Sequence, residues 1–313
     1  MVESGNSLEE KENGGVFHVP VMAERILAWL QPRSGATYVD CTLGLGGLAA
    51  RILEHSGPDG FLIGIDRDEE AIHMAQARLA PYSGRTRFIH GNFVDLKQHL
   101  SASGVSSVDG VILDLGVSSA QLGQADRGFS FLAEGPLDMR MDRTRGATAA
   151  EMLSRLSEQE LADLIYQYGE DRYARRIARQ IIRARNASPL LTTQQLVGVI
   201  REAVPGSYRH GRIHFATRTF QALRIAVNRE LEILESSIRD AAEMLATGAR
   251  LCVISFHSLE DRIAKHTFKA LSQGASPVLA VLTKRPETAS EDERHENPRA
   301  RSAKLRVAER RPS

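Results

Sequence analysis

Short apolar runs alternate with helical patterns through the first 116 residues of the chain. The run that begins at Tyr38 leads into a glycine-rich turn, and the fourth run, VDGVILDLG, is apolar on both faces, as is typical of a buried parallel strand. Strands that alternate with helices predict a right-handed, doubly wound α/β sheet that is mostly parallel. The later predicted strands cover residues 61–66, 85–93 and 108–116, and the predicted helices cover 68–80 and 94–100.

This alternation stops at Val117 and does not return before Gly211. A segment of roughly 95 residues is too long for a loop, so we expect a helical subdomain. It enters after the fourth strand, at the edge where such sheets bind ligands, and is therefore placed to hold a substrate. The predicted parts are a disordered tail over 1–15, an α/β domain over 16–116 and 212–313, and an inserted substrate-recognition domain over 117–211.

The pattern after the insert predicts a return to the sheet. A long helix over residues 216–246 precedes a fifth strand over 249–257 and a helix over 258–271. Residues 277–285 and 302–309 are two further strand candidates.

Composition adds limits to this picture. Forty basic and 39 acidic residues among 313 give a net charge of +1, so any polyanionic partner must be met by local patches. Cys41 and Cys252 are far apart and lack a C-x-x-C spacing, which argues against disulfides and structural zinc. No stretch is long and apolar enough to span a membrane, and no signal peptide or metal-ligand cluster is apparent, so we expect a soluble cytoplasmic protein.

The glycine-rich turn predicts a nucleoside pocket. Gly44, Gly46 and Gly47 allow close approach to a ligand, and Asp66 at the tip of the next strand can accept hydrogen bonds from a ribose. The G-x-G-x-x-G fingerprint of dinucleotide sites is not met, and Asp40 would repel a pyrophosphate while suiting a sulfonium group. The turn therefore favours S-adenosylmethionine. The alternative is a turn that merely needs glycine, with Asp66 as a solvated strand end.

Basic residues gather in three segments despite the neutral total. In RYARRIARQIIRAR the arginines and a stripe of Tyr173, Ile177 and Ile181 fall on different helix faces. A row of positively charged side chains with no acid between them predicts a phosphate-binding surface. The alternative is an ordinary charged helix face that only contacts solvent. The predicted RNA contacts are Arg172, Arg175, Arg176, Arg179 and Arg183, followed by Arg209, Arg212 and Arg218 of a second patch. The third patch runs from Arg294 to Arg311.

Several longer blocks carry a family resemblance. DLGVSSAQL, GPLDMRMD, YGEDRYARRIAR, ATRTFQALRIAVNRELE, SFHSLEDR and NPRARSAKLRVAER are similar to the signature blocks of the bacterial methyltransferases that modify the exocyclic N4 of a cytosine in the decoding region of 16S rRNA. The resemblance runs from about His18 to Arg310. It implies a class I, Rossmann-like S-adenosylmethionine-dependent methyltransferase domain with a helical insert that recognises rRNA, acting on 16S rRNA within the small ribosomal subunit.

By the same resemblance, a set of residues would hold the methyl donor. Two positions depart from the family pattern, because Leu48 stands where histidine is usual and Phe215 where proline is usual. A backbone contact at Leu48 would survive the change. The implied donor-binding residues are Gly46, Gly47, Leu48, Asp66, Phe93, Asp114 and Gln121.

The chemistry at an exocyclic amine suggests where the catalytic groups lie. The cytosine N4 lone pair is delocalised, so a hydrogen-bond acceptor for its N–H groups would assist attack on the sulfonium methyl. Asp114 ends the fourth strand and is the expected acceptor for the amine or for the donor's ammonium group, with a turn-capping acid as the alternative. Asp138, Asp142 and His257 are further pocket candidates.

Other readings stay open at this point. The target could be another RNA, a protein or a small molecule, or the chain could be a non-catalytic rRNA-binding assembly factor. The sequence also leaves open the oligomeric state and whether naked rRNA, the small subunit or an assembly intermediate is the substrate. Carbon-5 methylation is disfavoured because neither cysteine occupies a convincing catalytic turn.

Overall fold

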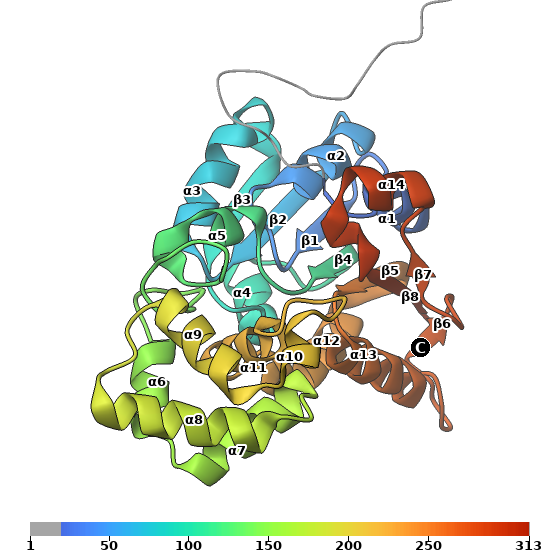
Figure 1. Cartoon of the computed structure of the whole chain (residues 1–313). Helices are drawn as coiled ribbons and strands as arrows, with labels where there is room; N and C mark the ends of the chain where they lie inside the picture. The colour runs from blue at the N-terminus through green and yellow to red at the C-terminus, as the bar shows by residue number, and fades with distance from the viewer. Residues whose placement is uncertain (1–19, 313) are drawn as a thin grey trace, which may run out of the picture.

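The computed structural model describes residues 20–312 and shows a mixed sheet with helices on both faces and a further group of helices beside it (Figure 1). The predicted tail over 1–15 lies outside the described residues. Five parallel strands come in the order β3–β2–β1–β4–β5, and β8 pairs antiparallel with β5. Strand order reverses direction at β1, which is the point where doubly wound sheets bind ligands. The predicted mostly parallel, doubly wound sheet is therefore confirmed.

The strands are β1 (Thr37–Asp40), β2 (Phe61–Asp66), β3 (Thr86–His90), β4 (Val108–Asp114), β5 (Leu245–Ser255), β6 (Leu279–Val281), β7 (Glu287–Thr288) and β8 (Lys304–Arg310). The helices of the α/β part are α1 (Ala23–Leu30), α2 (Gly47–His55), α3 (Glu69–Arg78), α4 (Leu96–Ala102), α5 (Ser119–Gly123), α12 (Glu230–Met244), α13 (Ser258–Leu271) and α14 (Glu291–Glu296). The remaining helices are α6 (Ala149–Arg155), α7 (Glu158–Gly169), α8 (Ala174–Ala187), α9 (Thr193–Ala203), α10 (Gly206–Arg209) and α11 (Thr217–Asn228). Short 3₁₀ turns lie at Ala80–Arg85, Phe93–Asp95, Ala125–Arg127 and Pro298–Arg301.

Both faces of the sheet are buried, which explains the apolar character of its strands. Alternate residues of a strand point to opposite faces. Tyr38 and Leu62 pack with α1 and α2 on one face, whereas Val39 and Ile63 pack with α4, α12 and α13 on the other. This double covering holds the carboxyl ends of β1, β2 and β4 in fixed relative positions.

The third strand is shorter than predicted. It ends at His90, not at Phe93, because the chain turns there: the Gly91 N–H donates to the Asp66 carbonyl, and the Asn92 side chain accepts from the Val94 N–H at 3.2 Å. The turn moves Phe93 out of the sheet into a 3₁₀ turn, from which it lines the main cavity.

The long helix predicted over 216–246 is two helices, so this prediction was wrong. Arg229 separates α11 from α12 and has a φ of 52°, in the left-handed region that ends a helix. The side chain of Asn228 forms three hydrogen bonds at the break: it accepts from the Met141 N–H at 2.8 Å and donates to the carbonyls of Met139 at 2.8 Å and Arg224 at 2.9 Å. A tertiary contact thus stabilises the interruption.

The fifth strand begins earlier than predicted. It runs from Leu245 instead of residue 249, and its pairing with β4 shifts register between Val108 and Gly110. Gly248, with a φ of 80°, provides the local bend. The two later strand candidates appear as β6 and β8, and β7, which the sequence did not predict, pairs with β8.

Helices α6 to α11 surround a hydrophobic core that is distinct from the two cores of the sheet. In Figure 1 these helices form the yellow and green group at the lower end of the molecule. Its core includes Leu153, Ile165 and Ile200, together with Phe215 and Phe220 from beyond residue 211. The division at 116/117 and 211/212 into an α/β domain and an insert stays a prediction.

Candidate functional site

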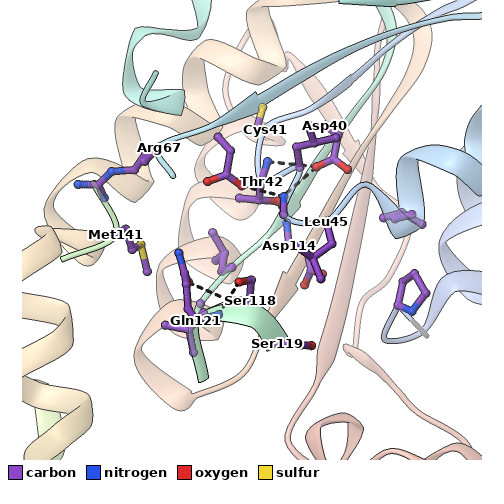
Figure 2. A pocket seen from close by; sticks show the side chains of 18 of the residues that line it. Asp40, Cys41, Thr42, Leu45, Arg67, Asp114, Ser118, Ser119, Gln121 and Met141 are labelled. Atoms are coloured by element: carbon purple, nitrogen blue, oxygen red, sulfur yellow. Dashed lines mark hydrogen bonds between the residues drawn. The ribbon is translucent and has the colours of Figure 1, made fainter. Parts of the chain in front are cut away.

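A cavity lies at the carboxyl ends of β1, β2 and β4 (Figure 2). Its polar wall comes from the loops after these strands, and α12 supplies Ile233 and Leu234 to the apolar wall. Met141 reaches the cavity from the segment that follows the start of the insert. The predicted donor-binding residues that line it are Gly47, Leu48, Asp66, Phe93, Asp114 and Gln121, and Gly46 lies between them in the turn.

The glycine turn closes tightly against its surroundings. Gly44 and Gly46 have φ values of 51° and 73°, which L side chains rarely adopt. A Cβ on Gly47 would lie 2.9 Å from Cγ of Pro20, so this position has no room for a side chain. Leu48 is buried and packs into the core beneath the turn. The Leu48 side chain therefore packs α2 against the core, and the residue also lines the cavity.

The Asp66 carboxylate is held in place by backbone groups. One oxygen accepts from the Gly44 N–H at 2.7 Å and the other from the Asp68 N–H at 2.9 Å. Burial raises the pKa of Asp66 above its ordinary value, while these two hydrogen bonds act in the opposite direction. A carboxylate has about four acceptor positions, so Asp66 can still accept hydrogen bonds from two hydroxyls.

Thr42 connects two acids in the cavity wall, Asp40 and Asp114. Asp40 accepts from the Thr42 N–H at 3.1 Å, and the Thr42 hydroxyl accepts from the Asp114 N–H at 2.7 Å. Burial is the main cause that raises the pKa of Asp40 to about 7, and the charge of Asp66 adds to it. The loop after β1 therefore sets the position of the acid that ends β4.

Asp114 carries the most informative unsatisfied atom of the cavity. Its Oδ1 is buried and has no hydrogen-bond partner within residues 20–312. Burial raises the pKa of Asp114 to about 7, the charges of Asp40 and Glu260 add to this, and Arg299 opposes it. A buried acceptor without a donor is costly unless a ligand supplies the donor.

Gln121 lines the cavity, but its amide is engaged in a structural network. Its Oε1 accepts from the Ser118 N–H at 3.0 Å, and its Nε2 donates to Asp68 at 2.8 Å. The same oxygen of Asp68 lies 2.6 Å from the buried guanidinium of Arg127, which also donates to the carbonyls of Arg140 and Met141. This network fixes the loop after β4 against the loop after β2.

A second set of acids in the cavity was missed by sequence reasoning. Glu230 and Glu260 both line it, and Arg224 binds Glu230 through two hydrogen bonds of 2.8 and 2.9 Å. Glu260 is buried and accepts from the Phe256 N–H at 2.8 Å. Burial alone would raise its pKa, but His257 and Arg224 outweigh it, so the pKa of Glu260 is lowered. Glu230 reaches the cavity because the chain breaks between α11 and α12. The sequence reasoning missed it because the helical pattern over 216–246 looks continuous and does not show this break.

Two of the three predicted catalytic residues do not line the cavity. Asp138 binds the guanidinium of Arg140 through two bonds of 2.8 and 2.9 Å, which lowers the pKa of Asp138 against the effect of its burial. His257 caps the N-terminus of α13, and its Nε2 lies 3.1 Å from Oε1 of Glu260. Their positions favour structural roles, and only Asp114 of this group faces the cavity.

The arginine row of the insert lies on the surface as its spacing indicates. Ile177 and Ile181 are buried in the helical core, and the five arginines of the row are exposed. Arg179 forms an ion pair with Glu158 at 3.3 Å, and the guanidinium carbon of Arg172 lies 4.9 Å from the Tyr173 ring centre. The row thus keeps most of its charge available to a ligand.

The second basic patch is less uniform. Arg209 and Arg212 are exposed, and Arg209 donates to the Val204 carbonyl at 3.1 and 3.2 Å. Arg218 is half-buried and donates to the Glu170 carbonyl. The assignment of both arginine sets to RNA stays a prediction.

The two cysteines are free, and both are buried. Cys41 lines the cavity, but burial raises its pKa well above the ordinary value, and burial raises the pKa of Cys252 to about 12. Neither thiol is thereby prepared to act as a nucleophile. The residues that the structure describes contain no group of three or more potential metal ligands and no helix long and apolar enough to cross a membrane.

Comparison with known proteins decides the family. A profile of the MraW methylase family matches residues 15–311. The chain belongs to this family. It is 50% identical over 309 residues to "Ribosomal RNA small subunit methyltransferase H" of Pelobacter propionicus, covering 94% of this chain and 99% of the relative. It is 53% identical over 296 residues to the protein of the same name from Sorangium cellulosum, covering 95% and 91%.

Solved structures with a similar fold are far more distant in sequence. They include SMU.1697c of Streptococcus mutans in complex with SAH, at 9% identity and a TM-score of 0.45, covering 94% of this chain and 99% of that one. Another is the SAM-dependent O-methyltransferase TM0748 of Thermotoga maritima, at 10% identity and a TM-score of 0.43, covering 93% and 65%. The family match confirms the resemblance of the sequence blocks, and together with the doubly wound, mostly parallel sheet it confirms the Rossmann-like, class I methyltransferase fold.

The methyl donor of this methyltransferase is S-adenosylmethionine, as predicted. The residues of the cavity fit it. Asp66 could accept hydrogen bonds from the ribose hydroxyls and Phe93 would add an apolar wall, while Gly47 leaves no room for a Cβ beside Pro20. The carboxyl groups of the buried Asp40 and the partly buried Asp114 suit the positive charge of a sulfonium or ammonium group.

Proposed function

We propose that this methyltransferase transfers a methyl group from S-adenosylmethionine to the exocyclic N4 of a cytidine in the decoding region of 16S rRNA. The observation that carries the proposal is the buried, unpartnered Oδ1 of Asp114 in the donor cavity. An exocyclic amine supplies the N–H donor that this oxygen lacks. The names of the relatives, which specify small-subunit ribosomal RNA, support the same class of substrate.

Asp114 would act directly on the amine. By accepting an N4–H hydrogen bond, its carboxylate localises the nitrogen lone pair and orients it for in-line attack. S-adenosylmethionine, when bound, would supply an electrophilic methyl group to this nitrogen, with the sulfur of the donor as the leaving group. The methylated nitrogen would then lose one proton, which Asp114, as an acid of the cavity wall, would accept. A pKa of about 7 suits an acid that must accept this proton and release it to water.

The surroundings of Asp114 would keep this geometry fixed. Thr42 holds its backbone, and the network of Gln121, Asp68 and Arg127 holds the loop that follows it. The apolar side chains Met141 and Phe256 line the same cavity and would exclude water from the flipped base. Positioning and desolvation are therefore provided by separate groups.

The helical insert would recognise the rRNA. Its exposed arginine row, Arg172 to Arg183, offers guanidinium groups of one sign to phosphates, and Arg209 and Arg212 extend the basic surface. The predicted domain over 117–211 would thereby hold the RNA while the α/β domain holds the donor. We place this reaction in the cytoplasm and on rRNA within the small subunit.

Methylation of subunits tests the proposal. Purified protein is incubated with labelled donor and with small subunits from cells that lack it, and modified 16S nucleotides are mapped by mass spectrometry. We expect one new N4-methylcytidine with the wild-type protein, and about 10²- to 10³-fold slower transfer with Asp114→Asn. Asp163→Asn, which changes an exposed acid of α7, is the control. Transfer to protein alone, or an unchanged rate with Asp114→Asn, would contradict the proposal.

A further inference from the structure

The C-terminal segment returns to the donor cavity and places a cation there. Arg299 lies in the 3₁₀ turn Pro298–Arg301, which the Asn297 side chain caps by accepting the Arg299 N–H at 3.1 Å. Its guanidinium lines the cavity and donates to the Val117 carbonyl and the Ser119 hydroxyl. It thus connects the C-terminal segment to the loop after β4, 182 residues earlier in the chain.

The two acceptors of Arg299 belong to the loop that follows Asp114. Ser118 caps α5 there, and its N–H is bound by Gln121, so the loop is tied on the opposite side to the network of Asp68 and Arg127. Arg299 is the second point of attachment. Without it, Val117 and Ser119 would lose their link to the C-terminal segment, and the direction in which Asp114 points would be less restricted.

The charge of Arg299 is also not neutralised locally. No carboxylate lies within 4.0 Å of its guanidinium among residues 20–312, whereas Arg224 is engaged by Glu230. The groups that act on Asp114 are Asp40 from β1 and Glu260 from α13, both negative, and Arg299, positive. Arg299 therefore supplies the positive charge that opposes two buried acids around Asp114.

We propose that Arg299 is a positioning residue for methyl transfer: it holds the Val117–Ser119 loop and, through its charge, keeps Asp114 in the carboxylate form that accepts the amine N–H. The inference rests on the proposed function of Asp114. It assigns to the third basic segment of the sequence a role inside the active site, separate from phosphate binding.

The turn that carries Arg299 provides a matched control. Arg301 lies two residues away in the same 3₁₀ turn, is exposed, and donates to the Arg294 carbonyl at 3.3 Å. Arg301→Gln removes the same charge from the same turn without touching the loop after β4. Arg299→Lys keeps the charge but cannot reproduce a planar guanidinium that binds two acceptors.

The experiment measures the ionisation of Asp114 directly and the pH profile of transfer. The protein is labelled with ¹³C at aspartate Cγ, Asp114 is assigned with Asp114→Asn, and the variants are titrated without donor. Removing a nearby positive charge makes the carboxylate harder to form, so we expect its midpoint to rise by about one pH unit in Arg299→Gln. In Arg299→Lys and Arg301→Gln it should stay near the wild-type value.

The rates of methyl transfer to small subunits should separate Arg299→Gln from the other two variants in the same way. For Arg299→Gln we expect kcat at pH 7 to fall about tenfold or more and to recover partly as the pH rises, with donor affinity changed less. Arg299→Lys should keep the wild-type pH profile at a lower kcat, and Arg301→Gln should keep the wild-type pH profile and kcat at saturating subunit concentrations. An Asp114 midpoint and pH profile that are unchanged in Arg299→Gln would overturn the charge role.

A folding defect would not leave the question open. If Arg299→Gln fails to fold by thermal melting, Arg299→Lys decides: a slower kcat at an unchanged midpoint supports the inference, and a wild-type kcat overturns it. Failure of the proposed function has a different signature, because wild-type protein would then place no N4-methylcytidine in 16S rRNA. The Asp114 midpoints would still report whether Arg299 acts on it.

Discussion

Two acids line the donor cavity, the buried Asp40 and the partly buried Asp114, whose Oδ1 atom is buried, and both are costly to ionise. Each has a pKa of about 7 in the folded protein, against the ordinary value of 3.8. The folded state therefore binds protons more tightly than the unfolded state between these values. Their contribution to stability is fully present below pH 4 and is lost as the pH rises through 7. The ionised acids thus lower the stability of the donor-free protein, and the same negative charges attract a cationic ligand.

This exchange predicts a pH-dependent gain in stability for Asp114→Asn. We expect the variant to melt near the wild-type temperature at pH 4.5 and above it at pH 8.5, where its free energy of unfolding should be higher by up to a few kcal/mol. Thermal melting of the donor-free protein at several pH values measures this. Asp163→Asn on exposed α7 is the control and should show no such trend. A constant difference across pH would contradict the burial argument.

At the scale of elements, the break between α11 and α12 shapes the site. A continuous helix would carry Glu230 and Ile233 past the cavity, whereas the left-handed Arg229 redirects α12 so that both line it. Asn228 stabilises this junction, and through Met139 and Met141 it also fixes the segment that closes the cavity on the insert side. One buried side chain thus couples the helix break to the cavity wall.

Loss of that side chain should be costly. In Asn228→Ala the Met141 N–H and the Met139 carbonyl lose their partner in a buried setting, so we expect a loss of about 2–4 kcal/mol of unfolding free energy. Donor affinity, measured by calorimetry, should fall as well because the Met141 wall loosens. Asn186→Ala on the exposed end of α8 should change both by little. Equal stability of the two variants would show that the junction does not depend on Asn228.

At the scale of the whole molecule, charge is distributed unevenly over a chain whose net charge is only +1. The donor cavity gathers acids, whereas the surface of α8 in the helical group gathers arginines. These two regions belong to different hydrophobic cores. We expect donor binding and RNA binding to be separable by mutation.

The triple variant Arg175→Gln/Arg176→Gln/Arg183→Gln tests this separation. Each lost phosphate contact should make the plot of log affinity against log salt concentration less steep by about 0.7–0.9. Because these contacts also contribute binding free energy, we expect the affinity for 16S rRNA to fall by roughly 10- to 100-fold. Donor affinity should not change. Replacing Arg33, Arg87 and Arg239, which lie outside the insert, by glutamine alters net charge equally and is the control. Equal losses in both triple variants would indicate a general charge effect instead of a binding surface.

Much of this could be predicted from local patterns. The alternation of strands and helices, the glycine turn with Asp66, and the two faces of α8 depend on residues close in sequence, so periodicity and turn chemistry reveal them. The end of β3 and the break at Arg229 were missed because each is stabilised by tertiary hydrogen bonds, from Gly91 and Asn228. The helix and strand propensities of neighbouring residues do not reveal such tertiary hydrogen bonds.

The sequence by itself determined the family, the sheet, the donor turn and the acid at the end of β4, because each is encoded in contiguous residues. Only the tertiary structure decided which charged groups share the cavity. It turned Asp138 toward Arg140 and made His257 a helix cap, and it brought Arg299 to the loop after Asp114. The physical reason is that the ionisation and orientation of a buried acid depend on its neighbours in space, and here they come from β1, α13 and the C-terminal turn.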